Sequence, residues 1–371
     1  MFICTSSVSM KTINLDYLRA IAALVVFFSH ALQIFWLPVV GLGSFLHHFC
    51  HTLSESAVLV FFVLSGYVIT FSMNKNIYRN NGSLISSEYF LHRFARVYPP
   101  LLLSIFVSIA VFLMLQLFNL PGYEAPLGLP RDIYHAREYL RISVFEVATA
   151  LAMYGGLLEI NGPLWSLYIE IRMYLLAGLF AMVFFSGNNL FKKFVLFLTL
   201  CIFIKLVFSS VASLYYPCWW LLGTLIYVVK REAFKFQSAL FFGLLFAVLV
   251  LTNKASITST TLNFIVICTI FICAFRYPLS ENRLLINTAS LSYTLYVLHF
   301  PLLLLGYSLF SYFYQMAEPS LLVRIMSSVS MTGLTYIIVF RLAPYVENVH
   351  WYQRVILSNI RKIKIKLKAT I

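Results

Sequence analysis

The stretch LDYLRAIAALVVFFSH at residues 15–30 decides the fold class, because nine consecutive side chains within it are apolar. Crossing a hydrocarbon core about 30 Å thick takes roughly 20 such residues at about 1.5 Å each. Three ionisable residues interrupt this apolar character, namely Asp16, Arg19 and His30. At about 100° per residue they fall within roughly 60° of one helix face. We therefore predict a membrane-spanning helix over 14–36 that carries its polar groups on one side.

The composition of the whole chain agrees with a membrane protein. Of its 371 residues, 61% are hydrophobic and 11% are charged, and the mean hydropathy is +0.87. Soluble domains contain roughly 25% charged residues. The net charge of +14 comes from basic residues that lie between apolar runs. That pattern is typical of membrane topology, so we expect lipid as a partner and no nucleic acid.

Apolar runs of similar length predict an all-α bundle of about ten transmembrane helices. The segment 141–160 is apolar but is broken by Gly155 and Gly156. We interpret it as an interfacial or half-inserted segment, with a full eleventh span as the alternative. The predicted spans are 14–36, 54–73, 99–119, 163–185, 194–211, 217–229, 236–252, 261–277, 288–311 and 321–343.

The placement of basic residues sets the orientation of this bundle. With ten spans, most lysines and arginines fall on one face, whereas the loop 37–53 on the other face has none. The positive-inside rule then places both termini in the cytoplasm. Counting 141–160 as a span would move Lys192 and Lys193 to the outside and invert every later loop.

We expect a single membrane-embedded domain over residues 1–371. It consists of an N-terminal tail (1–13), the helix bundle (14–343) and a basic cytoplasmic tail (344–371). The alternating lysines and isoleucines of that tail suit an anionic membrane surface. The alternative is a solvated end that only helps to set the topology.

His30 is the deepest ionisable residue of the first helix. An ionisable side chain at bilayer depth costs about 2.5–3.5 kcal/mol, so it normally faces the interior of the bundle. His30 lies eleven residues beyond Arg19, which is about 16 Å along a helix. A neutral imidazole can act as a general base. The alternative is a hydrogen-bonded histidine that only packs helices together.

Two arginines mark the stretch SSEYFLHRFARVYPP at 86–100. Arg93 and Arg96 share a helix face at i, i+3, and two guanidinium groups at that spacing suit a phosphate. Snorkelling to the membrane interface is the alternative. We expect Pro99 and Pro100 to end a short helix here and to open the next span.

A carboxylate lies inside the predicted span that follows Asn161. In NGPLWSLYIEIRMY (161–174), Ser166, Glu170 and Tyr174 share one face at i, i+4, i+8. A buried carboxylate needs a partner, and His30 is a plausible one because both lie toward the outer side.

A second intramembrane histidine occurs in SLSYTLYVLHFP at 290–301. Ser292, Tyr296 and His299 share a face at i, i+4, i+7. Hydroxyl groups around a histidine indicate a polar cavity more than a lipid-facing wall.

Small residues stand in the middle of the second predicted span. Ser65 and Gly66 interrupt a run of bulky apolar side chains. Such a pair lets a neighbouring backbone or a ligand approach closely, and helix packing is the more common reason for it.

Taken together, five stretches resemble the acyltransferase 3 family of bacterial membrane proteins, which includes O-acetyltransferases of lipopolysaccharide O-antigen and of exopolysaccharides. They occur in the family's order over about residues 14–301. They are LDYLRAIAALVVFFSH, VLVFFVLSGYVI, HRFARVYPP, GPLWSLYIEIRMY and LSYTLYVLHFP.

The resemblance implies a bundle in the bacterial inner membrane that transfers an acyl group, usually acetyl. The donor would be cytoplasmic acetyl-CoA, and the acceptor a carbohydrate hydroxyl on the far side, lipid-linked or on a surface polysaccharide. In that family the position matched by His30 is regarded as catalytic, and those matched by Arg93 and Arg96 as important for the donor. Glu170 matches the glutamate of the WSL motif. Arg172 departs from the family, which often has another polar residue there.

We therefore predict His30 and Glu170 as catalytic residues, with His30 activating the acceptor hydroxyl and Glu170 orienting the imidazole. A transiently acylated His30 is an alternative route. Arg93 and Arg96 are expected to hold coenzyme A. Arg19 either extends this basic path or only pairs with Asp16. The residues expected to contact substrate are Trp165, Ser166, Tyr174, Tyr296 and His299.

Two loops are expected on the acceptor side. HHFCH (47–51) holds three histidines, which we interpret as surface or substrate contacts, since we expect no metal. The segment 121–141 mixes aromatic, acidic and arginine side chains, a composition suited to a glycan.

Other functions stay open at this point. The same bundle could be a transporter or flippase of a lipid-linked glycan, with His30 and Glu170 as a proton relay. As an enzyme it could also act on a lipid or a small metabolite.

Overall fold

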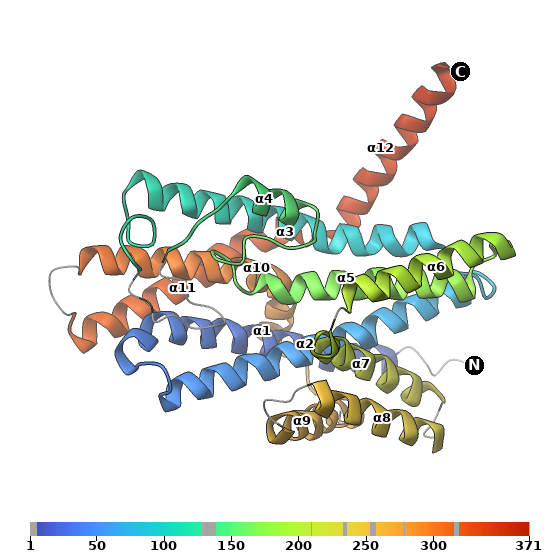
Figure 1. Cartoon of the computed structure of the whole chain (residues 1–371), viewed down its shortest axis with the longest axis horizontal. Helices are drawn as coiled ribbons and strands as arrows, with labels where there is room; N and C mark the ends of the chain where they lie inside the picture. The colour runs from blue at the N-terminus through green and yellow to red at the C-terminus, as the bar shows by residue number, and fades with distance from the viewer. Residues whose placement is uncertain are drawn as a thin grey trace.

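The computed structural model describes residues 6–127, 129, 139–208, 210–232, 236–252, 257–277, 279–314 and 319–370, without some helix-end side chains. Within these residues every regular element is a helix (Figure 1). The helices are α1 (Ser6–Val40), α2 (Phe45–Arg79), α3 (Ser86–Leu117), α4 (Val144–Leu151), α5 (Leu164–Phe185), α6 (Leu190–Val207), α7 (Tyr215–Glu232), α8 (Phe236–Thr252), α9 (Ile257–Arg276), α10 (Arg283–Phe313), α11 (Leu321–Val346) and α12 (Val349–Thr370), with a 3₁₀ turn at Val211–Leu214.

Seven stretches in the described part of the chain are long and apolar enough to cross a membrane, which confirms the predicted class of protein. They are α1 from Asn14, α2, α3, α5, α9, α10, and α11 with its continuation to Asn359. The other three predicted spans fall on helices α6, α7 and α8. Among these, α6 carries Lys192, Lys193 and Lys205 within its 18 residues. The number of ten spans therefore stays a prediction.

The segment 141–160 forms no spanning helix, as predicted. Its helix α4 has only 8 residues, about 12 Å of helix. The Ser143 hydroxyl and the Glu146 carboxylate cap its start in a reciprocal capping box. Gly156 then turns the chain back with a φ of 91°, and a Cβ there would lie 2.1 Å from the Glu146 carbonyl oxygen.

Helix α3 is continuous, so the predicted break at Pro99 and Pro100 is wrong. A proline removes one backbone hydrogen bond and crowds the preceding turn, but its fixed φ is compatible with a helix. Inside a membrane bundle, packing against neighbouring helices stabilises such a turn. Both prolines are buried, and α3 packs against α5 and α10.

Hydrogen bonds join the helix ends that the sequence assigns to one face. The amide of Asn14 near the start of α1 donates to the carbonyls of Ala274 (2.6 Å) and Tyr277 (2.8 Å) at the end of α9. The N–H of Leu84 before α3 donates to the carbonyl of Phe185 at the end of α5 (2.6 Å). The start of α1 therefore lies beside the end of α9, and the start of α3 beside the end of α5, as the predicted orientation requires. The cytoplasmic location of these four ends stays a prediction.

Helices α2 and α7 are in backbone contact through two glycines. A Cβ at Gly66 would lie 1.9 Å from the Trp220 carbonyl oxygen, and a Cβ at Gly223 would lie 1.9 Å from the Val63 carbonyl oxygen. The Trp220 indole N–H also donates to the Ser65 hydroxyl at 3.2 Å. The neighbour predicted to approach Ser65 and Gly66 is thus helix α7, and small residues permit this packing.

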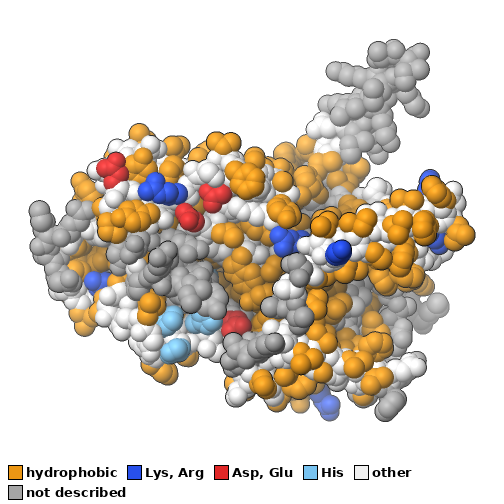
Figure 2. Space-filling view, viewed as in Figure 1, with side chains coloured by type: hydrophobic (Ala, Val, Ile, Leu, Met, Phe, Trp, Pro, Cys, Tyr) orange, Lys and Arg blue, Asp and Glu red, His pale blue; other side chains and the backbone are white. Residues whose placement is uncertain are grey.

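The interior of the bundle is built around α10, which packs against α1, α3 and α11. Apolar side chains cover much of the outer surface (Figure 2), as lipid requires. The parallel course of α1 and α10 brings the two intramembrane histidines to the same depth.

Candidate active site

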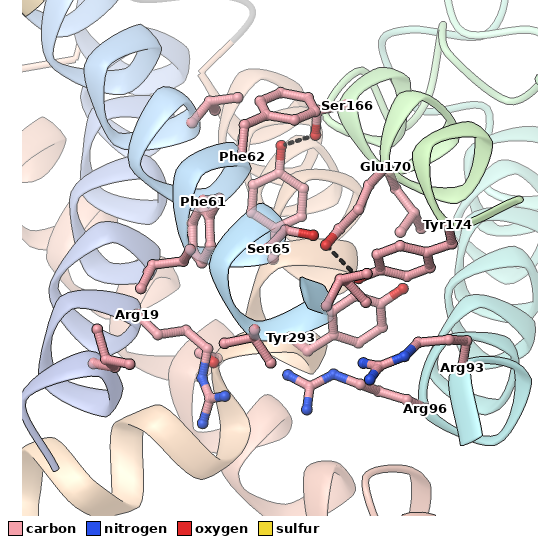
Figure 3. A pocket seen from close by; sticks show the side chains of 18 of the residues that line it. Arg19, Phe61, Phe62, Ser65, Arg93, Arg96, Ser166, Glu170, Tyr174 and Tyr293 are labelled. Atoms are coloured by element: carbon pink, nitrogen blue, oxygen red, sulfur yellow. Dashed lines mark hydrogen bonds between the residues drawn. The ribbon is translucent and has the colours of Figure 1, made fainter. Parts of the chain in front are cut away.

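One cavity opens between α1, α2, α3, α5 and α10 and encloses about 950 Å³, part of it open to solvent. Arg19, Arg93 and Arg96 lie at one end and Ser166 at the other (Figure 3). Glu170, Tyr174 and Tyr293 lie between these ends. Five helices that are far apart in the sequence therefore contribute to one polar site. The remaining lining is largely apolar and includes Leu15, Val58, Phe61, Phe62, Leu64, Val68, Ile69 and Leu167.

The arginine end of the cavity contains all three arginines that the sequence predicted for the donor. Arg93 is only 6% exposed, and its guanidinium carbon lies 5.8 Å and 5.9 Å from the ring centroids of Tyr89 and Tyr174. Arg19 forms an ion pair with Asp16 at 3.0 Å and also lines the cavity. Both predicted interpretations of Arg19 are therefore compatible with its position.

Two hydrogen-bonded pairs line the rest of the cavity. The Tyr174 hydroxyl donates to a carboxylate oxygen of Glu170, one turn earlier on α5. Nearer the other end, the hydroxyls of Ser166 and Tyr296 are 2.6 Å apart. The face of α5 predicted from the i, i+4, i+8 spacing thus points into the cavity. It meets the predicted face of α10 through Tyr296.

His30 and His299 form a hydrogen-bonded pair in the core. They are 2% and 0% exposed, and Nδ1 of His30 lies 2.7 Å from Nε2 of His299. The ring planes differ by 9°. On its other side, Nδ1 of His299 lies 2.9 Å from the Leu295 carbonyl oxygen.

This chain of bonds assigns a tautomer to each imidazole. A carbonyl oxygen only accepts, so Nδ1 of His299 carries the hydrogen that it donates to Leu295. In a neutral His299, Nε2 then accepts, and Nδ1–H of His30 is the donor. Nε2 of His30 is therefore the nitrogen with a lone pair available for a proton, which is the property a general base requires.

The sequence predicts Glu170 as the group that orients His30, whereas in the structure Nδ1 of His30 is hydrogen-bonded to His299. The sequence predicts His299 only as a substrate contact. Its place in an i, i+4, i+7 pattern marked it as polar and buried. The pairing of α1 with α10 over 269 residues is not visible in a single sequence.

The ring of Tyr296 lies next to both the cavity and the histidine pair. Tyr296 lines the cavity, and its ring centroid lies 6.1 Å from that of His299 and 5.6 Å from that of Phe61. The remaining predicted substrate contact, Trp165, packs on Tyr216 of α7 with ring centroids 4.6 Å apart. The cavity thus approaches the imidazoles to within one side chain.

Other candidates lie elsewhere. Arg172 donates to the Tyr154 carbonyl at 3.1 Å, and its guanidinium carbon lies 5.3 Å from the Tyr154 ring centroid. His47 lies near His48 and His51 at the start of α2, with ring centroids 5.4 Å and 6.4 Å apart. No group of three possible metal ligands occurs among the residues searched, which are those described. Residues 128 and 130–138 of the predicted glycan-binding segment lie outside the described part of the chain.

A family model described as an acyltransferase domain matches residues 12–340, which is nearly the whole bundle. The chain belongs to the acyltransferase 3 family. The resemblance inferred from the five sequence stretches is thereby confirmed. No solved structure matches the chain at a significant level.

Three proteins are similar to this acyltransferase 3 chain over part of its length. Acyltransferase MdmB of Streptomyces mycarofaciens is 32% identical over 162 residues, 44% of this chain and 37% of that protein. Protein 2 in the picA locus of Rhizobium radiobacter is 29% identical over 169 residues, 43% of this chain and 78% of that protein. Nodulation protein 10 of Rhizobium leguminosarum bv. viciae is 30% identical over 174 residues, 44% of this chain and 42% of that protein. The aligned part is thus less than half of two of these three proteins.

Proposed function

We propose that the protein is an O-acyltransferase of the bacterial inner membrane that transfers an acetyl group from cytoplasmic acetyl-CoA to a hydroxyl of a cell-surface carbohydrate, such as lipopolysaccharide O-antigen or exopolysaccharide. The observation that carries this proposal is a cavity with three arginines at one end and a buried histidine pair next to the other. Family membership supports acyl transfer. The acetyl donor and the carbohydrate acceptor rest on the resemblance.

The charge of the arginine end favours an anionic donor. Three guanidinium groups line this end, against the carboxylates of Asp16 and Glu170 in the same lining. The Nε atoms of Arg19 and Arg93 are buried and have no hydrogen-bond partner among the described residues. Guanidinium groups bind phosphate oxygens with two parallel hydrogen bonds. The phosphates of coenzyme A would supply those partners and leave the thioester directed along the cavity.

The histidine pair supplies the proton transfer. Nε2 of His30 takes the proton of the acceptor hydroxyl as its oxygen attacks the thioester carbonyl. The carbon–sulfur bond then breaks, and the imidazolium returns the proton to the leaving coenzyme A sulfur. While His30 is charged, its Nδ1–H donates to His299, which donates to Leu295. In this proposal the Glu170 carboxylate balances the positive charge that develops on the His30 imidazolium in the transition state.

A second route remains within this proposal. Nε2 of His30 could attack the thioester itself and carry the acyl group to the hydroxyl in a second step. Both routes need the same tautomer of His30, so the hydrogen bond to His299 serves either. Trapping of a radiolabelled acyl-protein that is absent in His30→Ala would distinguish them.

The function is tested by measuring O-acetyl groups on the surface polysaccharide of the host bacterium by mass spectrometry. The strains are wild type, a deletion, and the deletion complemented with His30→Ala or with Arg172→Ala as a matched control. We expect acetyl groups to be lost in the deletion and in His30→Ala and kept in Arg172→Ala. Acetyl groups that persist in the deletion would refute the carbohydrate acceptor. Loss of the polysaccharide itself would favour a transporter.

A further inference from the structure

Gln33 lies one helical turn beyond His30 on α1, on the side away from the arginines. It is 5% exposed. Both its amide oxygen and its amide nitrogen are buried and have no hydrogen-bond partner among the described residues. Its neighbours Ile34 and Phe35 belong to the apolar core. A complete carboxamide is thus buried with neither polar atom bonded to a described residue.

Such a group is unfavourable for folding unless something binds to it. Buried polar atoms in folded proteins nearly always have partners, and an amide deprived of them loses its full solvation energy. Methionine has nearly the same shape as glutamine and no such penalty. An amide at this position therefore needs a reason other than packing.

Asn161 shows what a structural amide looks like in the same bundle. It is 0% exposed, and its amide nitrogen donates to the Ser104 hydroxyl at 2.9 Å and to the Val297 carbonyl at 2.8 Å. These bonds connect the start of α5 with α3 and α10, although the Asn161 amide oxygen also has no hydrogen-bond partner among the described residues. Gln33 forms no comparable connection between helices within the described structure.

We propose that Gln33 binds the acceptor of the transfer reaction, with its amide oxygen and nitrogen hydrogen-bonded to hydroxyl groups of a sugar. An amide both donates and accepts hydrogen bonds, and so does a sugar hydroxyl. The phosphates of acetyl-CoA, by contrast, only accept hydrogen bonds. The order along α1 is Arg19, His30, Gln33, so the base lies between the donor end and this amide. A sugar held by Gln33 presents a neighbouring hydroxyl to His30, about one turn of helix away. This assignment rests on the proposed function.

The variant Gln33→Met tests the proposal because it removes only the polar atoms. The acceptor probe is the surface polysaccharide of the host after removal of its acetyl groups with alkali, and the donor is radiolabelled acetyl-CoA. The whole protein is assayed in phospholipid vesicles. We expect KM for the polysaccharide to rise about tenfold or more. The thermal unfolding midpoint is expected to shift upward, because two unsatisfied atoms are gone.

Two controls separate binding from folding. Gln116→Met makes the same substitution at an exposed position near the end of α3. It should alter neither KM for the polysaccharide nor the thermal unfolding midpoint. Asn161→Leu removes structural hydrogen bonds and should lower the unfolding midpoint. A lower midpoint for Gln33→Met, or an unchanged KM with an active wild type, refutes the role of Gln33 alone. A wild type that binds acetyl-CoA but transfers nothing to this polysaccharide refutes the proposed acceptor and the ligand of Gln33 with it.

Discussion

Replacement of His299 by phenylalanine tests the central feature of the site, which is the tautomer of His30. The variant keeps an aromatic ring in the core but removes the acceptor that lies 2.7 Å from Nδ1 of His30. A buried donor left without a partner costs about 1–3 kcal/mol. His30 then favours the tautomer or ring position in which Nε2 carries the hydrogen and cannot act as the base. Since about 1.36 kcal/mol corresponds to tenfold in rate, kcat should fall about 5- to 150-fold.

A comparison of His299→Gln with His299→Asn makes this prediction specific. The amide oxygen of glutamine reaches the position of the lost Nε2, whereas the shorter asparagine places its polar atoms near the position of Nδ1. Glutamine should therefore restore much of the rate and asparagine should not. The assay is single-turnover transfer of radiolabelled acetyl groups in membranes, with protein amounts matched by immunoblot.

The Michaelis constant for acetyl-CoA provides the internal control. The arginines lie at the opposite end of the cavity from Ser166, whose hydroxyl is hydrogen-bonded to that of Tyr296 beside His299. KM for acetyl-CoA should therefore stay within about twofold. Equal losses in the phenylalanine, glutamine and asparagine variants would mean that His299 only packs the core. A phenylalanine variant with the wild-type rate would refute the tautomer argument itself.

Three further predictions follow from the donor end, the base and the helix packing. Arg93→Gln should weaken acetyl-CoA binding about tenfold or more, measured by calorimetry, while Arg172→Gln should not, and high salt should reduce the difference. His30→Ala should lower the transfer rate about 10²–10⁴-fold with acetyl-CoA affinity retained, so a parallel loss of affinity would contradict its role as a base. Gly66→Ala should lower the thermal unfolding midpoint because its Cβ would overlap α7, whereas Gly333→Ala, with nothing within 4 Å, should not.

The positions of the helices could largely be predicted from apolar runs, but their ends could not. The second span is predicted to begin at residue 54, whereas α2 begins at Phe45. Before the third span the sequence predicts a separate short helix that ends at Pro99 and Pro100, whereas α3 runs without a break from Ser86. A helix ends where its backbone hydrogen bonds stop, and this need not coincide with the end of an apolar run.

The residues of the candidate site could be predicted from the sequence, but which of them form hydrogen bonds with each other could not. Ionisable side chains are rare at bilayer depth, so Arg93, Glu170, His30 and His299 could be selected from the sequence. The hydrogen-bond partner of His30 could not be selected in this way, because the sequence predicts both Glu170 and His299 to be polar and deep in the membrane. Gln33 was overlooked because an uncharged amide in an apolar run attracts no notice until its lack of partners is seen.

The sequence by itself determined that this is an all-helical membrane protein of the acyltransferase 3 family, and which polar residues lie within its spans. Only the tertiary structure decided that α1 lies along α10, which brings His30 to His299 and fixes the proton-accepting nitrogen. The physical reason is that lipid and protein interior are both apolar. Hydrophobicity therefore does not specify which faces of two membrane helices meet, and close packing and hydrogen bonds between distant segments do.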